Sequence, residues 1–230
     1  AKINVIYRDV LKKFNLIESF LRHDINNHAF YASGISEYLI KHAVLHEDIL
    51  KEIEDLTKTK GYESFEIDAK IDSIHALLRN YDGLFSQMVA LLKERGYKDF
   101  GLVGKMRDNA HKLENITPRY QNFVLSLRRH EKDYMMRNEL TYIEKLNALA
   151  AQLEEEFNRD RGLTEDKRHT YLQLLNEYQR LFNNMVEMDR RIGIRDNAGL
   201  KFQLDLHAEK IENAFVRIIN DSARKKQEIF

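Results

Sequence analysis

Apolar side chains recur along most of this chain at alternating steps of three and four residues, which is the spacing of one face of an α-helix. The first of these stripes extends from about Ile3 to about Leu56 and predicts a single helix. Such a helix would contain roughly 50 residues and be about 75–80 Å long. That length exceeds the usual length of a globular helix, so it indicates either a coiled-coil-like element or a helix shared by two stacked modules.

Five further helices are expected, separated by short segments that contain glycine and polar residues. The second helix follows a break at about 58–64 and carries a nearly perfect heptad seam. The fourth is long again, with Thr117 as its cap and Pro118 in its first turn. No segment alternates as a β-strand does, so the predicted fold class is all-α. The expected ranges of these five helices are about 67–92, 102–116, 119–157, 165–192 and 200–230.

Two long helices and four shorter ones can form two antiparallel four-helix bundles stacked end to end. The first helix would pass through the lower bundle into the upper one, and the fourth would return through both. The lower, membrane-proximal bundle would then contain about 1–27 and 138–230, and the membrane-distal bundle about 28–137. Both bundles would belong to one domain, 1–230, and both ends of the chain would emerge at the same end of the lower bundle.

Charge and composition exclude several classes of protein. The chain has 37 Lys and Arg residues against 37 Asp and Glu residues, so it lacks the basic footprint of a general nucleic-acid-binding protein. Cysteine is absent, which excludes thiolate catalysis and cysteine-ligated zinc. No apolar run approaches about 20 residues, so we expect no membrane span within this chain. The chain begins at Ala1 and ends at Phe230 within a helical pattern, so we expect a piece excised from a longer protein.

The sequence offers little for catalysis or for metal binding. It contains no GxSxG motif, no HExxH motif and no phosphate-binding glycine loop. His42 and His46 lie one helical turn apart, which is the minimal geometry for two metal ligands, but the sequence directs no distant histidine at them. We therefore expect a non-catalytic domain with no metal and no cofactor.

One stretch of the fourth predicted helix, "SLRRHEKDYMMR" at 126–137, is rich in charged residues. Together with "GLVGKMRDNAHKLEN" at 101–115, it resembles the helical bimodular sensor domain of bacterial chemoreceptors and sensor histidine kinases. The layout of helices is similar over the whole chain, whereas the recognisable motif is confined to about 101–137. The resemblance implies a periplasmic domain of an inner-membrane protein, inserted between two transmembrane helices. It also implies binding of a small solute, typically a small carboxylate, inside one or both bundles.

Candidate ligand-binding residues are polar side chains on or beside the apolar stripes, because a bundle core excludes such groups unless they are paired. Histidines that interrupt a stripe, including His42, are either satisfied within the core or donate hydrogen bonds into a pocket. Arginines that flank a stripe suit a carboxylate, since the guanidinium donates two parallel hydrogen bonds. Tyrosines, Tyr178 among them, could close the pocket. The predicted site comprises Arg22, His28, Arg79, Tyr81, Arg128, Lys132, Tyr134, His207 and Arg217.

The charged stretch has two interpretations. Glu131 and Tyr134 share one face of the predicted helix, while Arg128 and Lys132 are like charges one turn apart that need acids from elsewhere or an anionic ligand. A salt-bridge network at the junction of the two bundles is favoured over direct contact with a ligand.

The predicted function is that of an extracytoplasmic ligand-sensing domain of a transmembrane receptor. A small solute, an organic acid or a similar polar molecule, would bind between helices and shift them relative to each other. Because transfer of the signal usually needs paired subunits, we expect a homodimer across the first helix. Two alternatives remain open: a sensor that reads a periplasmic solute-binding partner protein, and a cytoplasmic coiled-coil scaffold with no small ligand.

Overall fold

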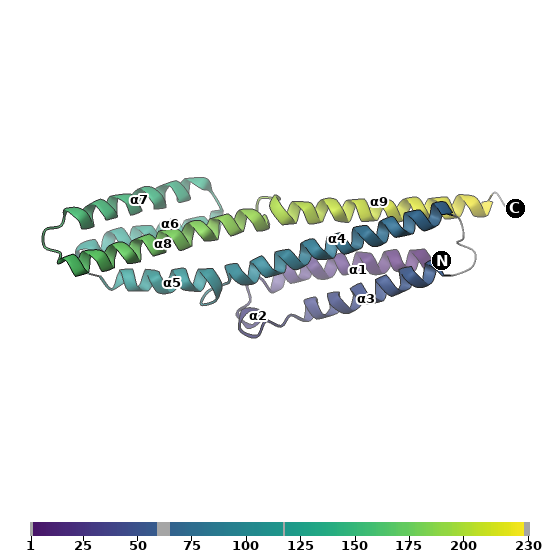
Figure 1. Ribbon diagram of the computed structural model, residues 1–230, viewed down its shortest axis with the longest axis horizontal. Coiled ribbons are helices and arrows are strands. Elements are labelled where there is room, and N and C mark those ends of the chain that lie inside the picture. Colours follow the sequence, from purple (N-terminus) through teal and green to yellow (C-terminus); the bar gives the residue numbers. More distant parts are fainter. Residues whose placement is uncertain (1, 59–64, 117, 228–230) are drawn as a thin grey trace. The chain divides into compact units, whose positions relative to one another are not determined.

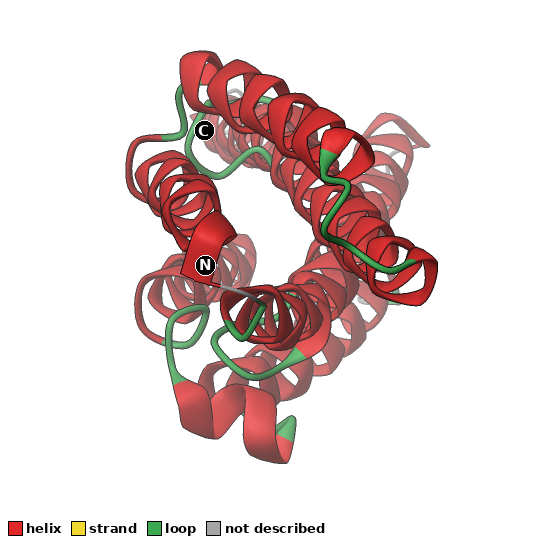
Figure 2. Cartoon of the chain, turned by 90° about the vertical axis from the view of Figure 1, so that its left-hand side faces the viewer, coloured by secondary structure: helices red, strands yellow, loops and turns green. Residues whose placement is uncertain are grey.

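The computed structural model describes residues 2–58, 65–116 and 118–227. Over these ranges the chain forms nine α-helices, one short 3₁₀ helix and no strand (Figure 2). The predicted all-α fold class is therefore confirmed for the described part of the chain. Most of the expected break at 58–64 and the expected cap Thr117 lie outside the described residues.

The helices follow one another along the chain as drawn in Figure 1. Their bounds are α1 Lys2–His23, α2 His28–Ser33, α3 Glu37–Thr57, α4 Phe65–Arg95, α5 Gly101–Glu114, η1 Pro118–Tyr120, α6 Gln121–Arg137, α7 Leu140–Arg159, α8 Glu165–Ile192 and α9 Gly199–Gln227.

The prediction of one long first helix is wrong. Three helices, α1, α2 and α3, occupy this part of the chain, and α3 runs back alongside α1 (Figure 1). Local capping explains the breaks: the side chain of Asn27 accepts a hydrogen bond from the first turn of α2, and the side chain of Ser36 does the same for α3. Between them, Gly34 ends α2 at φ 71°, a left-handed conformation that glycine adopts without strain.

The predicted fourth helix is also divided. α6 ends at Arg137, Asn138 caps it at φ 56°, and α7 begins at Leu140 and packs alongside α6. Asparagine tolerates the left-handed region better than most residues, and this position reverses the chain. The charged stretch 126–137 therefore lies at the C-terminal end of a helix, not in the middle of a long one.

The chain divides into two compact units whose boundaries differ from the predicted bundles. Unit 1 contains residues 1–92 and 192–230, and unit 2 contains residues 93–191. The reversals explain the difference. Because the chain turns back between α1 and α3, residues 37–57 pack onto α1, and because it turns at Asn138, α7 stays with α6.

Each unit is a bundle of helices around its own core. In unit 1, α1, α3, α4 and α9 contribute buried apolar side chains, and the predicted seam of α4 is buried from Ile71 to Leu92. In unit 2, α5, α6, α7 and α8 do the same.

The first and last helices are antiparallel neighbours within unit 1. The ring of Tyr7, near the start of α1, stacks on Phe215 of α9 with ring centroids 5.2 Å apart. Lys201, near the start of α9, forms an ion pair of 2.9 Å with Glu18, near the end of α1. The start of α1 and the end of α9 therefore lie at the same end of unit 1 (Figure 1).

Candidate functional site

A group of ionisable side chains lies inside unit 1, and we call Lys13, His42, His46 and Asp82 together the Lys13 cluster. Lys13 is on the inward face of α1, one turn from buried apolar side chains on either side, and its exposed fraction is 0%. His42 and His46 lie one turn apart on the buried face of α3, and Asp82 is on α4. Helical periodicity places His42 and His46 on one face of α3, and the packing of the three helices brings all four residues together.

Asp82 is the common partner of the other three residues. Its Oδ1 atom lies 3.5 Å from Nζ of Lys13 and 3.8 Å from both Nε2 of His42 and Nδ1 of His46. The amine of Lys13 is also hydrogen-bonded to Nδ1 of His46. Since a protonated amine can only donate, His46 accepts at Nδ1 and carries its own proton at Nε2.

Burial determines the protonation states of this cluster. It lowers the pKa of Lys13 to about 8, although the carboxylate of Asp82 acts in the opposite direction. Burial, with the charge of Lys13 as the second cause, lowers the pKa of His42 to about 3 and also lowers the pKa of His46. At neutral pH the cluster therefore holds a mostly protonated lysine beside two uncharged imidazoles.

A cavity of about 360 Å³ opens beside the Lys13 cluster, between α3 and α4. His42 is 5% exposed, and its Nε2 atom has no hydrogen-bond partner among the described residues. A buried polar atom without a partner costs roughly 1–3 kcal/mol. The cavity thus combines carboxylates and an apolar wall with a neighbouring buried polar atom that lacks a partner among the described residues. Its polar lining includes His42, Glu47 and Asp82, and its apolar lining Leu39, Phe85 and Val89.

Six residues of the predicted site belong to unit 1, and none of them lines this cavity. Tyr81 lies beside the Lys13 cluster, since its buried ring is 6.0 Å from Nζ of Lys13. His207 is half-buried, and its Nδ1 lies 2.8 Å from the carbonyl oxygen of Gln203 on the same helix. The other four are exposed. The three arginines lie beside an apolar stripe, at the edge of the buried face, whereas His28 is expected on the stripe but lies at the start of α2, where the chain turns back. These four are Arg22, His28, Arg79 and Arg217.

The charged stretch of α6 contributes to an ion-pair network inside unit 2. Glu131 is buried, and the hydroxyl of Tyr178 donates a hydrogen bond of 2.5 Å to its Oε2. Arg128 lies 3.4 Å from a carboxylate oxygen of both Glu131 and Glu114, whereas Lys132 is exposed. Burial raises the pKa of Glu131, while Tyr178 and Arg128 oppose that rise. All the partners lie on α5, α6 and α8, so the network connects helices of one unit.

Tyr134 takes part in a second polar contact within unit 2. Its hydroxyl donates a hydrogen bond of 3.3 Å to Oδ2 of Asp189, and Asp189 also pairs with Arg95. Burial is the main cause that raises the pKa of Tyr134. The three predicted residues of this unit, Arg128, Lys132 and Tyr134, therefore do not converge on one pocket.

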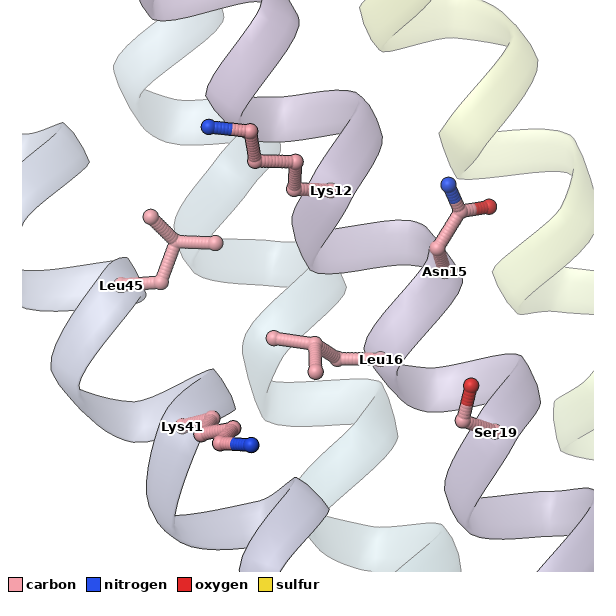
Figure 3. A pocket seen from close by; sticks show the side chains of 6 residues that line it. All are labelled: Lys12, Asn15, Leu16, Ser19, Lys41 and Leu45. Atoms are coloured by element: carbon pink, nitrogen blue, oxygen red, sulfur yellow. The ribbon is translucent and has the colours of Figure 1, made fainter.

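Two other hollows are less suited to a ligand. Figure 3 shows one of about 380 Å³ between α1 and α3, where Leu16 and Leu45 face each other. Its cations are already paired, Lys12 with Asp9 at 2.8 Å and Lys41 with Glu37 at 2.5 Å. A wider hollow of about 750 Å³ in unit 2 is lined mainly by α8 and is largely open.

Comparison with known proteins adds no relative. A scan against protein-family models, a search of curated proteins and a search of solved structures each found no match. None of the described helices is both long enough and apolar enough to cross a membrane. Within the same residues, no group of three or more histidine, cysteine or acidic side chains is arranged to hold a metal ion.

Sequence reasoning identified only part of the Lys13 cluster. His42 was expected as a polar interruption of an apolar stripe, and its pairing with His46 was noted. Lys13 was missed because the neighbouring Phe14 satisfies the same helical spacing, and Asp82 because it follows Tyr81 in the seam. The available signal was that position 13 also fits the stripe, three residues after Val10.

Proposed function

We propose that this chain is the ligand-sensing domain of a transmembrane signalling receptor, a chemoreceptor or a histidine kinase, and that it is extracytoplasmic. It binds a small polar solute that carries a carboxylate, in the cavity beside the Lys13 cluster. The observation that carries this proposal is the fully buried Lys13, held beside a cavity lined in part by His42, whose Nε2 atom is buried and has no hydrogen-bond partner among the described residues.

A purely structural role explains this cluster poorly. Bundle cores are filled by apolar side chains, and burial of an ammonium group opposes folding unless a well-placed partner compensates. Asp82 compensates only in part, because the pKa of Lys13 remains lowered to about 8. A ligand that supplies an acceptor for the lysine charge and a partner for His42 offsets both costs when it binds.

The geometry of unit 1 supports transmission of such a signal. The cluster joins α1 to α3 and α4, and α1 is also the antiparallel neighbour of α9. A ligand that prefers one packing of these helices shifts α1 relative to α9, and displacements on the order of 1–2 Å are typical of such shifts. Both helices end at the same end of unit 1, where we propose that they continue into the membrane.

The bimodular architecture belongs to the same proposal. Each unit supplies four principal helices, α1, α3, α4 and α9 in one and α5 to α8 in the other. We propose that they act as the two four-helix modules of a helical bimodular sensor, and that the receptor is a homodimer. Stacking of the modules and pairing of subunits across α1 stay predictions.

Ligand binding is tested by a thermal-shift screen of organic acids, amino acids and amine oxides on the chain described here. A ligand at a hundredfold excess over its dissociation constant should stabilise the fold by about 2.7 kcal/mol. Lys13→Met should abolish that stabilisation. The adjacent Lys12→Met, whose side chain is 57% exposed, should retain it.

Two results would count against the proposal. If no solute changes the melting temperature, a sensor that reads a partner protein is favoured. If the gene encodes no apolar span of about 20 residues on either side of this chain, the receptor assignment fails and a coiled-coil scaffold is favoured.

A further inference from the structure

The charges around the cavity differ from those of a site built for a simple anion. Two carboxylates, Asp82 and Glu47, line it, and the buried cation beside it is Lys13, which is hydrogen-bonded to His46. Asp82 makes its contacts with the Lys13 cluster through Oδ1, and its side chain is 30% exposed. A dicarboxylate would place further negative charge against these two acids, which is unfavourable.

The opposite end of the site suits a negative group. His42 is uncharged and more than nine-tenths buried, and the nearby Asp82 Oδ1, 3.8 Å from Nε2, favours the tautomer that carries its hydrogen on that atom. This buried N–H group has no hydrogen-bond partner among the described residues. A carboxylate oxygen that accepts from it also gains from the positive charge of Lys13. A ligand with an amine alone would meet that positive charge without compensation.

A ligand with both charges satisfies both ends. We propose that this site binds a zwitterionic α-amino acid with an apolar side chain, its carboxylate on Nε2 of His42 and its ammonium group on Asp82 and Glu47. The inference rests on the proposed sensing function and specifies its ligand class.

Dimensions and lining restrict the ligand further. The two charged groups of an α-amino acid are both attached to the α-carbon, which matches a donor and a carboxylate only 3.8 Å apart. Leu39, Phe85 and Val89 form an apolar wall for the side chain. A volume of about 360 Å³ lies at the small end of the range for ligand sites, so small aliphatic side chains are favoured.

The test is isothermal titration calorimetry of the whole chain with matched probes. The proteinogenic amino acids are screened first. Valine is then compared with isovalerate, which lacks its amine, and with isobutylamine, which lacks its carboxylate. Removal of the amine leaves Asp82 and Glu47 without a cation, and removal of the carboxylate leaves Nε2 of His42 without an acceptor. Each truncated probe should therefore bind at least about 30-fold more weakly than the amino acid.

Two variants assign the two ends of the ligand. Asp82→Asn should remove the preference for valine over isovalerate, and His42→Gln should weaken valine and isovalerate alike. Asp72→Asn, at an exposed position of the same helix, is the matched control and should leave all affinities unchanged. The comparison of probes uses the unaltered chain, so it remains decisive even if a variant does not fold.

The outcomes separate this inference from the proposed function. Tighter binding of isovalerate or of other simple carboxylates than of any amino acid overturns the inference and leaves the sensing function in place. Retained preference for valine in Asp82→Asn overturns it as well. Absence of binding by amino acids and organic acids alike overturns both.

Discussion

Acid should destabilise this protein through His42 in particular. The imidazole is buried beside Lys13, His46 and Asp82, and its pKa is lowered from 6.5 to about 3. The folded state therefore resists a proton that the unfolded chain binds readily. The resulting contribution to stability is complete above pH 6.5 and is lost as the pH falls toward 3.

The size of the effect follows from the same two values. The full fall from 6.5 to about 3 corresponds to about 5 kcal/mol, at 1.36 kcal/mol per pKa unit. Most of the loss occurs before the folded state itself takes up the proton. Between pH 7 and pH 4 the His42 contribution should fall by about 3 kcal/mol.

Urea unfolding at a series of pH values from 7 to about 4 measures this loss. Other groups titrate in the same range, among them the buried Glu131, whose raised pKa acts in the opposite direction. The informative quantity is therefore the difference in the free energy of unfolding between the unaltered chain and His42→Gln at each pH. Glutamine keeps a polar side chain at this position but cannot take up the proton. His207→Gln, at a half-buried position of α9, is the matched control and should follow the unaltered chain.

Parallel pH profiles for the unaltered chain and His42→Gln, within about 0.5 kcal/mol, would refute the reasoning, since surface substitutions alone stay within that range. Titration of the His42 ring followed by NMR gives an independent reading. Protonation of that ring near pH 6.5 would show that it is hydrated and not held in a desolvated site.

Three further substitutions test the fold and the cluster by urea unfolding at neutral pH. Lys13→Met should raise the free energy of unfolding by about 1–3 kcal/mol, because burial disfavours the charge of Lys13 more than Asp82 stabilises it. An equal free energy of unfolding for Lys13→Met and Lys12→Met would contradict this cost. Tyr178→Phe should lower the free energy of unfolding by about 1–3 kcal/mol, because it removes the hydrogen-bond donor to the buried Glu131. The double variant Tyr178→Phe with Glu131→Leu should lose less stability than the sum of the two single variants. Asn138→Ala should lower the free energy of unfolding by about 1 kcal/mol, because alanine is strained in the left-handed conformation of this position, whereas Asn138→Gly should leave it unchanged. Equal losses of stability in the two variants would argue against the αL cap.

The helical class of this protein is readable from its sequence, whereas the reversals of the chain are not. The apolar stripe continues in apparent register through 24–36, where the structure turns back on itself. Periodicity reports which face is buried but does not report chain direction. The decisive features were local: caps at Asn27 and Ser36, with Gly34 between them. Capping residues and glycines of this kind are common in helical proteins, so the sequence alone does not show that these three end one helix and begin another that runs back.

The candidate site was predictable only to the extent that polar residues replace apolar ones in a stripe. That rule identified His42, but it selected positions beside the stripe, such as Arg79, as readily as positions within it. Sequence spacing cannot tell that Lys13 on α1 and Asp82 on α4 face the same point, because that depends on the relative rotation of two helices. A site assembled from three helices is therefore a property of packing, and its members carry no common local pattern.

The energetic cost of the Lys13 cluster is itself an argument for a sensor. A ligand can shift the equilibrium between two packings of the helices only by its difference in affinity for them. A difference in binding free energy of about 2–3 kcal/mol changes the ratio of the two packings by roughly a hundredfold. An apolar core at this position would hold α1, α3 and α4 in one deep minimum, against which such a gain is small. A core that contains a desolvated ammonium and an imidazole with an unpartnered Nε2 atom has a shallower minimum, and the proposed ligand would supply bonds that this core lacks. Because α1 also pairs with α9 through Glu18 and Lys201, a change in its packing reaches both helices that end at the same end of unit 1.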